Sequence, residues 1–196
     1  MHPELLSLCL FALVTSCSPG PNNIVASYSA FNFGLIKTIP HMLGVIFGFT
    51  TLVVVMNFGF INIFKRLPIL QEMLKYTGSI FLIYLAYKIA FSKLKSDNSS
   101  NNPVKFIETF FFQFLNPKAV IVSIIMVSTY VQKGANFINY SLWVIGVAFF
   151  FACFSIVFWT LIGKFLRKFV TNEKFIKRFN LIMSFLLVSC IATFYL

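Results

Sequence analysis

Two short motifs that combine proline with hydrogen-bonding side chains interrupt an otherwise apolar chain. The first is S-P-G-P-N-N at residues 18–23, and the second is N-P-K at residues 116–118. Each proline removes one backbone N–H and disfavours the helical conformation of the residue before it. In a membrane, such broken backbone survives only against protein or a polar cavity. Carboxamides beside each break add donors and acceptors, so the motifs predict a binding site for a polar solute.

Lys118 is the charged residue of the second motif, and it lies well inside an apolar stretch. An ammonium in that position is unfavourable unless it is paired, hydrated or able to reach the membrane surface. It could form an ion pair with a substrate carboxylate, or it could bind the carbonyls that Pro117 frees. Its long stem could instead reach the interface without any function. Because intramembrane charges are functional by default, we expect one of the first two roles.

One of the two histidines, His41, lies near the start of the second apolar run. Imidazole titrates near neutral pH and could carry protons. A lone histidine at a helix end is as often a hydrogen-bonded structural residue, and the sequence leaves both roles open. Glu72 and Glu108 lie near the ends of apolar runs beside Lys75 and Lys105, where we expect interfacial helix pairs. The sequence therefore predicts no carboxylate relay deep inside the membrane.

Other kinds of site chemistry have little support in the sequence. Its four cysteines form no C-x-x-C pair and lie in apolar runs, where they behave as small hydrophobic side chains. Nucleophile–base constellations are also missing. We therefore predict no enzyme, no thiol relay, no metal site and no cofactor. A small-ion or metal permease of similar architecture is the alternative, although it would need clusters of acidic, His or Cys ligands. The cysteines are Cys9, Cys17, Cys153 and Cys190.

The composition is that of a helical membrane protein. Of 196 residues, 59% are hydrophobic and only 11% are charged, and the mean hydropathy is +0.87. Average soluble domains carry about 25% charged residues. Runs such as 45–60 and 141–162 do not alternate as barrel strands would, so we expect helices. The net charge of +11 lies mostly between the apolar runs, which indicates membrane orientation rather than nucleic-acid binding.

The apolar runs predict an all-α membrane protein with about six transmembrane helices in two inverted three-helix repeats. Helices one and four are broken at the proline motifs. We expect residues 1–95 to form the first repeat, 96–103 a polar linker and 104–196 the second repeat, within one integral membrane domain. A short loop is expected at 32–37 and a turn at 132–136. The expected spans are 5–31, 39–63, 70–91, 106–131, 137–163 and 179–196.

Two interrupted helices at matching places in inverted repeats are the best sequence indication of a transporter's binding site. Prolines also produce simple kinks in membrane helices. Two matched breaks, each flanked by asparagine, favour the site over the kinks. We expect the breaks to lie opposite each other near mid-membrane, where the N-termini of half-helices can hold a carboxylate.

The distribution of basic residues predicts the orientation. Eleven lie in the first, third and fifth connections or at their edges, and four lie on the other side. Positive residues favour the cytoplasm, so we expect both termini on the outer side. The eleven are Lys37, Lys88, Lys93, Lys95, Lys105, Lys164, Arg167, Lys168, Lys174, Lys177 and Arg178, and the four are Lys65, Arg66, Lys75 and Lys133.

The motifs resemble a known family. S-P-G-P-N-N, followed by N-F-G at 32–34, P-H at 40–41 and G-x-x-x-G at 44–48, looks like the first-half signature of the LysE/RhtB family of amino-acid exporters. F-L-N-P-K-A at 114–119 resembles the signature of the second half. The resemblance implies an inner-membrane secondary transporter that exports amino acids or their derivatives, in exchange for protons.

The resemblance also implies site residues and substrates. Many relatives have Asp where this chain has Asn22, which removes a carboxylate for proton coupling or for a cationic substrate. We therefore expect neutral amino acids such as homoserine, threonine or leucine-like molecules. The glycines Gly44 and Gly48 form a helix-packing face, within the chain or between the protomers of a homodimer. The expected substrate-binding residues are Pro19, Gly20, Pro21, Asn22, Asn23, His41, Asn116, Pro117 and Lys118.

Overall fold

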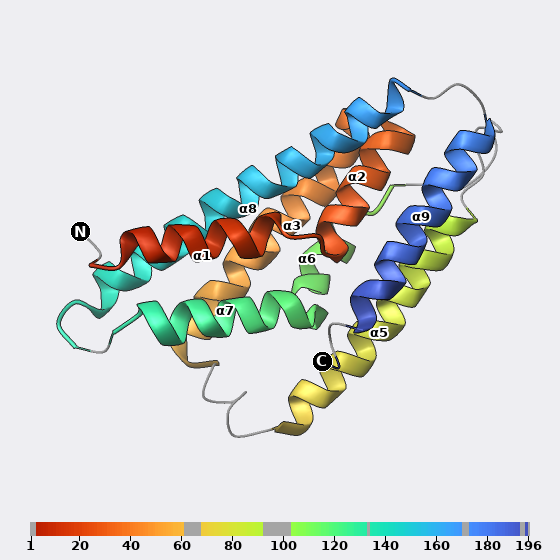
Figure 1. The fold of residues 1–196 in the computed structure, drawn as a ribbon. Helices are drawn as coiled ribbons and strands as arrows, with labels where there is room; N and C mark the ends of the chain where they lie inside the picture. Colours follow the sequence, from red (N-terminus) through yellow and green to blue (C-terminus); the bar gives the residue numbers. More distant parts are fainter. Residues whose placement is uncertain are drawn as a thin grey trace.

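The computed structural model describes residues 3–60, 68–91, 103–132, 134–169, 173–192 and 195, and all its regular structure within these ranges is helical. Figure 1 shows the arrangement. The all-α class predicted from composition is therefore confirmed. The helices are α1 (Leu5–Cys17), α2 (Pro21–Phe33), α3 (Leu35–Val55), η1 (Met56–Phe60), α5 (Pro68–Ala90), α6 (Phe106–Leu115), α7 (Pro117–Tyr130), α8 (Phe137–Arg167) and α9 (Glu173–Ala192).

Both proline motifs interrupt the helical backbone, as predicted. The chain turns by 54° between α1 and α2 and by 63° between α6 and α7. Pro21 and Pro117 each occupy the first position of the new helix, where the missing N–H has no helical partner to lose. Gly20 and Asn116 precede them in extended conformations. Covalent geometry therefore fixes where each new helix begins.

The number of membrane spans agrees with the prediction only in part. Within the described residues, three helices are long and apolar enough to cross a membrane, and the count rises to five if each bent pair is one span. The predicted third span, α5, has 23 residues but is not among them. Six spans in two inverted repeats, and the division into residues 1–95, 96–103 and 104–196, thus stay predictions. Most of the linker lies outside the described residues.

Several predicted boundaries are wrong. The second span begins at Leu35 rather than near residue 39, so Pro40 lies inside α3. Gly34 alone joins α2 to α3, because its φ of 84° reverses the chain direction in one residue. The basic stretch after the fifth span is partly helical, since α8 continues to Arg167 and α9 begins at Glu173. Cations in the last turn of α8 interact favourably with its dipole.

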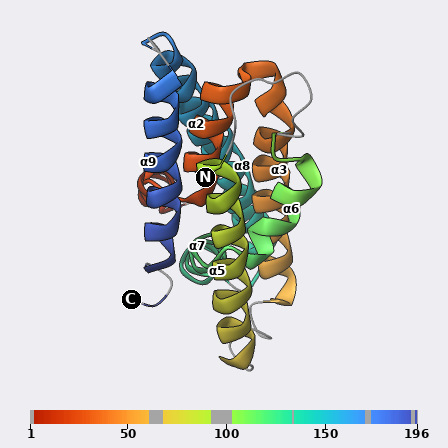
Figure 2. The same cartoon turned by 90° about the vertical axis from the view of Figure 1, so that its right-hand side faces the viewer.

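Small residues bring the helices close together. An added Cβ at Gly44 would lie 2.7 Å from the carbonyl oxygen of Phe106, and one at Gly48 would lie 2.7 Å from that of Phe110. The G-x-x-x-G face thus packs α3 against α6 within the chain. An added Cβ at Gly163 of α8 would come even closer to the backbone of Ser27 in α2. The long α8 follows both α1 and α2, while α5 and α9 run side by side (Figure 2).

Candidate functional site

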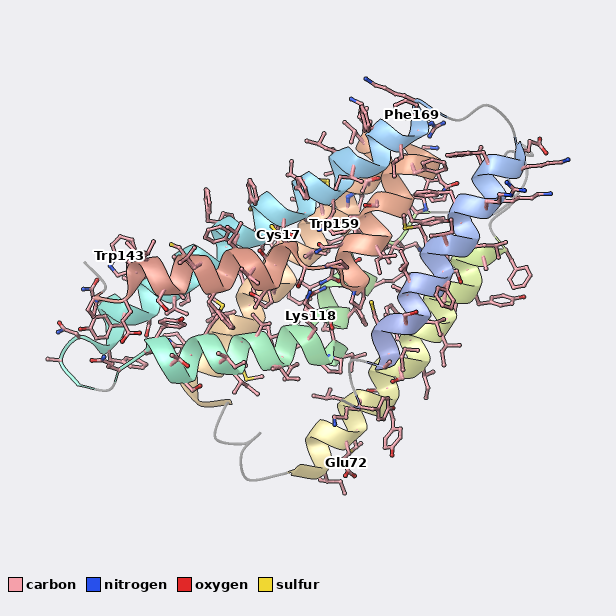
Figure 3. All side chains as sticks on the ribbon, in the orientation of Figure 1. Cys17, Glu72, Lys118, Trp143, Trp159 and Phe169 are labelled. Carbon is pink, nitrogen blue, oxygen red and sulfur yellow. The ribbon has the colours of Figure 1, made fainter. Side chains whose placement is uncertain are left out.

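The two helix breaks meet through Lys118. Its Nζ donates to Ser18 Oγ at 2.7 Å, to the Ser18 carbonyl at 3.1 Å and to the Pro19 carbonyl at 3.4 Å. Figure 3 shows Lys118 of α7 close to the end of α1. Gly20 leaves the space for this contact, because a Cβ there would lie 3.0 Å from Nζ. The sequence predicted that Lys118 could bind the carbonyls freed by Pro117. Lys118 does bind carbonyls, but they are those of Ser18 and Pro19 at the first break.

Three further side chains bind the carbonyls that α1 leaves free at its end. Asn23 Nδ2 donates to the Ser16 carbonyl at 2.8 Å and to the Ser18 carbonyl at 3.0 Å. From α8, Ser155 Oγ donates to the Ser16 carbonyl at 2.6 Å, and Trp159 Nε1 donates to the Cys17 carbonyl at 3.1 Å. Carbonyls at a helix end need such partners when water is excluded. This part of the first break is therefore held by both α2 and α8.

A second polar network joins α2, α3 and α6. Asn22 and Gln113 form a reciprocal carboxamide pair, with Asn22 Nδ2 donating at 2.7 Å and Gln113 Nε2 donating at 3.1 Å. The buried imidazole of His41 lies 3.1 Å from the Asn22 carbonyl through Nε2 and 2.9 Å from Thr109 Oγ1 through Nδ1. Since a carbonyl only accepts, Nε2 carries the hydrogen in this contact. In this structure, His41 thus positions the first turn of α2 against α6.

The second break is simpler. Asn116 Oδ1 accepts from the Lys118 backbone N–H at 3.2 Å, which caps α7. Asparagine is one of the preferred residues at this position. One N–H that could have bound a substrate carboxylate is therefore already occupied by the side chain two residues before it.

A cavity of about 620 Å³, a figure that includes its open mouth, lies where the breaks meet. Among the described residues that line it, only Lys118 carries a charge. One end is polar and the other is apolar. The polar end comprises Thr15, Ser16, Gly20, Pro21, Asn22, Asn23, Asn116, Lys118 and Ser155, and the apolar lining comprises Ala12, Val45, Phe49, Ala119, Val122, Met126, Ala148, Phe151, Ala152 and Ile156.

The cavity brings together six of the nine expected substrate-binding residues: Gly20, Pro21, Asn22, Asn23, Asn116 and Lys118. Pro19, His41 and Pro117 do not line it. Three residues that bind these side chains or the broken backbone were not predicted, namely Gln113, Ser155 and Trp159. Gln113 had a signal, because it is a lone carboxamide within a run of phenylalanines. A serine and a tryptophan in an apolar run have no comparable signal.

Within the described ranges, no group of three or more His, Cys, Asp and Glu residues is arranged to hold a metal ion. The cysteines Cys9, Cys17, Cys153 and Cys190 are not joined in disulfides. A metal permease would need such ligands, so the structure gives this alternative no support.

Broken helices that meet at a polar cavity are the architecture of a membrane transporter. The sequence comparisons agree. A profile for the LysE type translocator matches residues 13–194. Two curated cysteine/O-acetylserine efflux proteins are similar over 194 residues, which is 97% of this chain and 97% of each relative. The one from Salmonella typhimurium is 31% identical and the one from Escherichia coli strain K12 is 29% identical. No solved structure matches.

The chain belongs to the LysE type translocator family. The resemblance seen in the two motifs is thereby confirmed. The protein is a multi-pass membrane transporter and not an enzyme.

Proposed function

We propose that this protein exports small neutral amino acids, and that their zwitterionic end binds at the meeting of the two breaks. The observation that carries this proposal is the cavity, whose lining joins one ammonium and several carboxamides to an apolar wall. A charged cargo side chain would lose its hydration against that wall without gaining a partner. An apolar side chain loses no such hydration there, and an uncharged polar one loses much less than a charge would.

The binding mode follows from the donors and acceptors at the polar end. Lys118 already donates to two carbonyl oxygens and one hydroxyl of the first break. A carboxylate is a stronger acceptor than a carbonyl for an ammonium donor. We propose that the cargo carboxylate takes over one or more of these bonds. The released carbonyls of Ser18 and Pro19 then accept from the cargo ammonium.

The names of the relatives sharpen the substrate class. Cysteine and O-acetylserine are both neutral amino acids, as are homoserine, threonine and leucine. We propose cysteine and O-acetylserine as the first substrates to test, followed by the other three. Asn22 supports the choice because it leaves no carboxylate for a cationic side chain at this position.

Proton antiport is part of the proposal. His41 is the imidazole next to the site, and both of its ring nitrogens have partners in the structure. It accepts a proton only if the Thr109 hydroxyl turns from donor to acceptor. Efflux that rises when the outside is made more acidic would support antiport, and efflux unchanged by a pH gradient would contradict it.

We also propose an inner-membrane location with both termini on the outer side. The basic residues at the ends of α8 and α9 support it through the positive-inside rule. A reporter that is active only in the cytoplasm should work when fused at residue 98 and fail when fused at residue 196. The reverse pattern would overturn this topology. A homodimer stays a prediction, and Gly44 and Gly48 do not argue for it because they already pack against α6.

Transport is tested with purified protein in vesicles preloaded with labelled amino acids. We expect faster efflux of cysteine, O-acetylserine and threonine than from protein-free vesicles, with lysine and glutamate released at the protein-free rate. Equal release of all five would contradict a selective site. Efflux of lysine or glutamate alone would show that the cavity does not select neutral cargo.

A further inference from the structure

The cavity changes character along two helices in the same direction. On α7 its lining runs from Lys118 and Ala119 at the break to Val122 and then Met126. On α8 it runs from Ser155, which donates to the first break, back through residues 152 and 151 to 148. Seven helical residues span about 10 Å. On each wall the hydrogen-bonding side chain, Lys118 or Ser155, therefore lies near the breaks, and the lining farther along the helix is apolar.

Large side chains line the apolar end. Phe49 of α3, Met126 of α7 and Phe151 of α8 lie among the lining residues, and Met126 is only 1% exposed. Ala152 is also buried and lines the cavity, and along α8 it lies between Ser155 and Phe151. A cargo held by its zwitterion at the breaks would extend its side chain past Ala152 toward these three residues.

We propose that Ala152, Met126 and Phe151 determine how long a neutral cargo side chain the protein exports. This inference rests on the proposed function, because it assumes that the zwitterion binds at the breaks. Ala152 sets the width of the cavity beyond its polar end, and Met126 and Phe151 set how far a cargo side chain can extend into it. An apolar pocket distinguishes side chains that differ by one methylene by about 10- to 200-fold. Single substitutions here should therefore change the selection between short and long cargo.

Narrowing the cavity is the first test. Ala152→Val adds two methyl groups to the wall, so efflux of leucine should fall about tenfold relative to efflux of alanine. The matched control is Gly146→Ala, also on α8, where an added Cβ meets nothing within 4 Å. The control should leave the leucine-to-alanine ratio unchanged. The ratio is the readout because a merely destabilised protein would lose efflux of both substrates equally.

The second test widens the apolar end of the cavity, and it predicts faster efflux of a long cargo. Phe151→Leu removes part of the ring that limits the cavity, so efflux of methionine should rise relative to alanine by about tenfold. Phe150→Leu is the matched control. Phe150 immediately precedes Phe151 on α8, is 61% exposed and does not line the cavity. Met126→Val should act like Phe151→Leu and carries the test if that variant does not fold.

The outcomes separate the two proposals. Selective efflux by the wild type with unchanged ratios in Ala152→Val and in the widened variants would overturn the role of these residues and leave the proposed function intact. Opposite shifts of the ratio in the narrowed and widened variants would support it. A wild type that releases no amino acid faster than protein-free vesicles would overturn both proposals together.

Discussion

The two helix breaks have similar angles but are stabilised in different ways. The first leaves residues 18–20 between α1 and α2, whereas the second leaves only Asn116 between α6 and α7. Carbonyls at the first break receive donors from α2, α7 and α8. At the second break, Asn116 caps the next helix with its own side chain. The first break therefore depends on the tertiary structure, and the second depends on local sequence.

Lys118 connects the two helix breaks. It belongs to the motif of the second break, yet its ammonium binds the oxygens of the first. The two motifs, about a hundred residues apart in the chain, thus meet at one cavity. A cargo that drew Lys118 away from Ser18 would also remove a donor from the first break, so we expect binding in the cavity to affect the bend.

Replacing Lys118 by alanine should have the largest effect. Hydrogen bonds to charged groups contribute about 1.5–3 kcal/mol each, and about 3 kcal/mol corresponds to a roughly hundredfold change in rate. We expect Lys118→Ala to slow amino-acid efflux about a hundredfold at equal protein level in the membrane. Lys164→Ala, at an exposed lysine in the last turn of α8, is the control and should retain full efflux.

Lys118→Arg sharpens the same test. Arginine keeps the charge, but its planar group is larger than an ammonium and Gly20 leaves little spare room beside Nζ. We expect efflux between those of the alanine variant and the wild type. Full-rate efflux by Lys118→Ala would show that the link between the breaks is dispensable.

The asparagines of the two breaks should differ in their effects on stability. Asn23 is buried, donates to two carbonyls and lies 3.3 Å from Ser155 Oγ, whereas Asn116 makes one capping bond. We expect Asn23→Ala to lower the free energy of unfolding by about 3 kcal/mol, because three hydrogen bonds of about 1 kcal/mol each are lost. Asn116→Ala should lower it by about 1 kcal/mol, the usual effect of losing a cap. Denaturation in mixed micelles measures both.

A serine at each position checks the assigned cause. Serine is a good helix cap, so Asn116→Ser should recover most of the lost stability. Asn23→Ser should not, since a hydroxyl has one donor and a shorter reach than the carboxamide. Equal losses in the two alanine variants would contradict the difference between the breaks.

The predictable part of this molecule is the part decided by local covalent geometry. Proline fixes its own backbone and lacks an N–H, so the breaks at residues 18–23 and 116–118 could be found without a structure. Apolar composition likewise predicted the helices. Lys118 was recognised as unusual from its charge alone. Its partners were not, because the choice between the carbonyls of one break and the other is made by the packing of α7 against α1.

Residues whose role is set by a distant contact could not be predicted in the same way. Trp159 donates to a carbonyl 142 positions earlier in the chain, and Ser155 donates to one 139 positions earlier. Nothing in the apolar run that contains them distinguishes these two from their neighbours. The start of α3 was also missed, because one glycine with a positive φ, Gly34, replaces the loop that the sequence predicted.

The Asn22–Gln113 pair tests whether the polar network that joins α2, α3 and α6 acts as a unit. Asn22 and Gln113 bind each other directly at 2.7 and 3.1 Å. We expect Asn22→Ala and Gln113→Ala each to reduce efflux about tenfold, and the double variant to be no worse than either, a coupling of about 1 kcal/mol or more. Additive effects in this double-mutant cycle would mean that the two side chains act separately.

Trp159→Phe should have the smallest effect, because it removes one donor and keeps most of the ring. The Cys17 carbonyl then loses its bond to Nε1, while the neighbouring carbonyls keep Asn23 and Ser155. A typical hydrogen bond contributes about 1 kcal/mol, so unfolding should become easier by about that amount. Trp143→Phe is the matched control, since Trp143 lies on the same helix and is 36% exposed. If both variants lose the same stability, the Trp159 contact is dispensable, and the support that α8 gives to the first break reduces to Ser155.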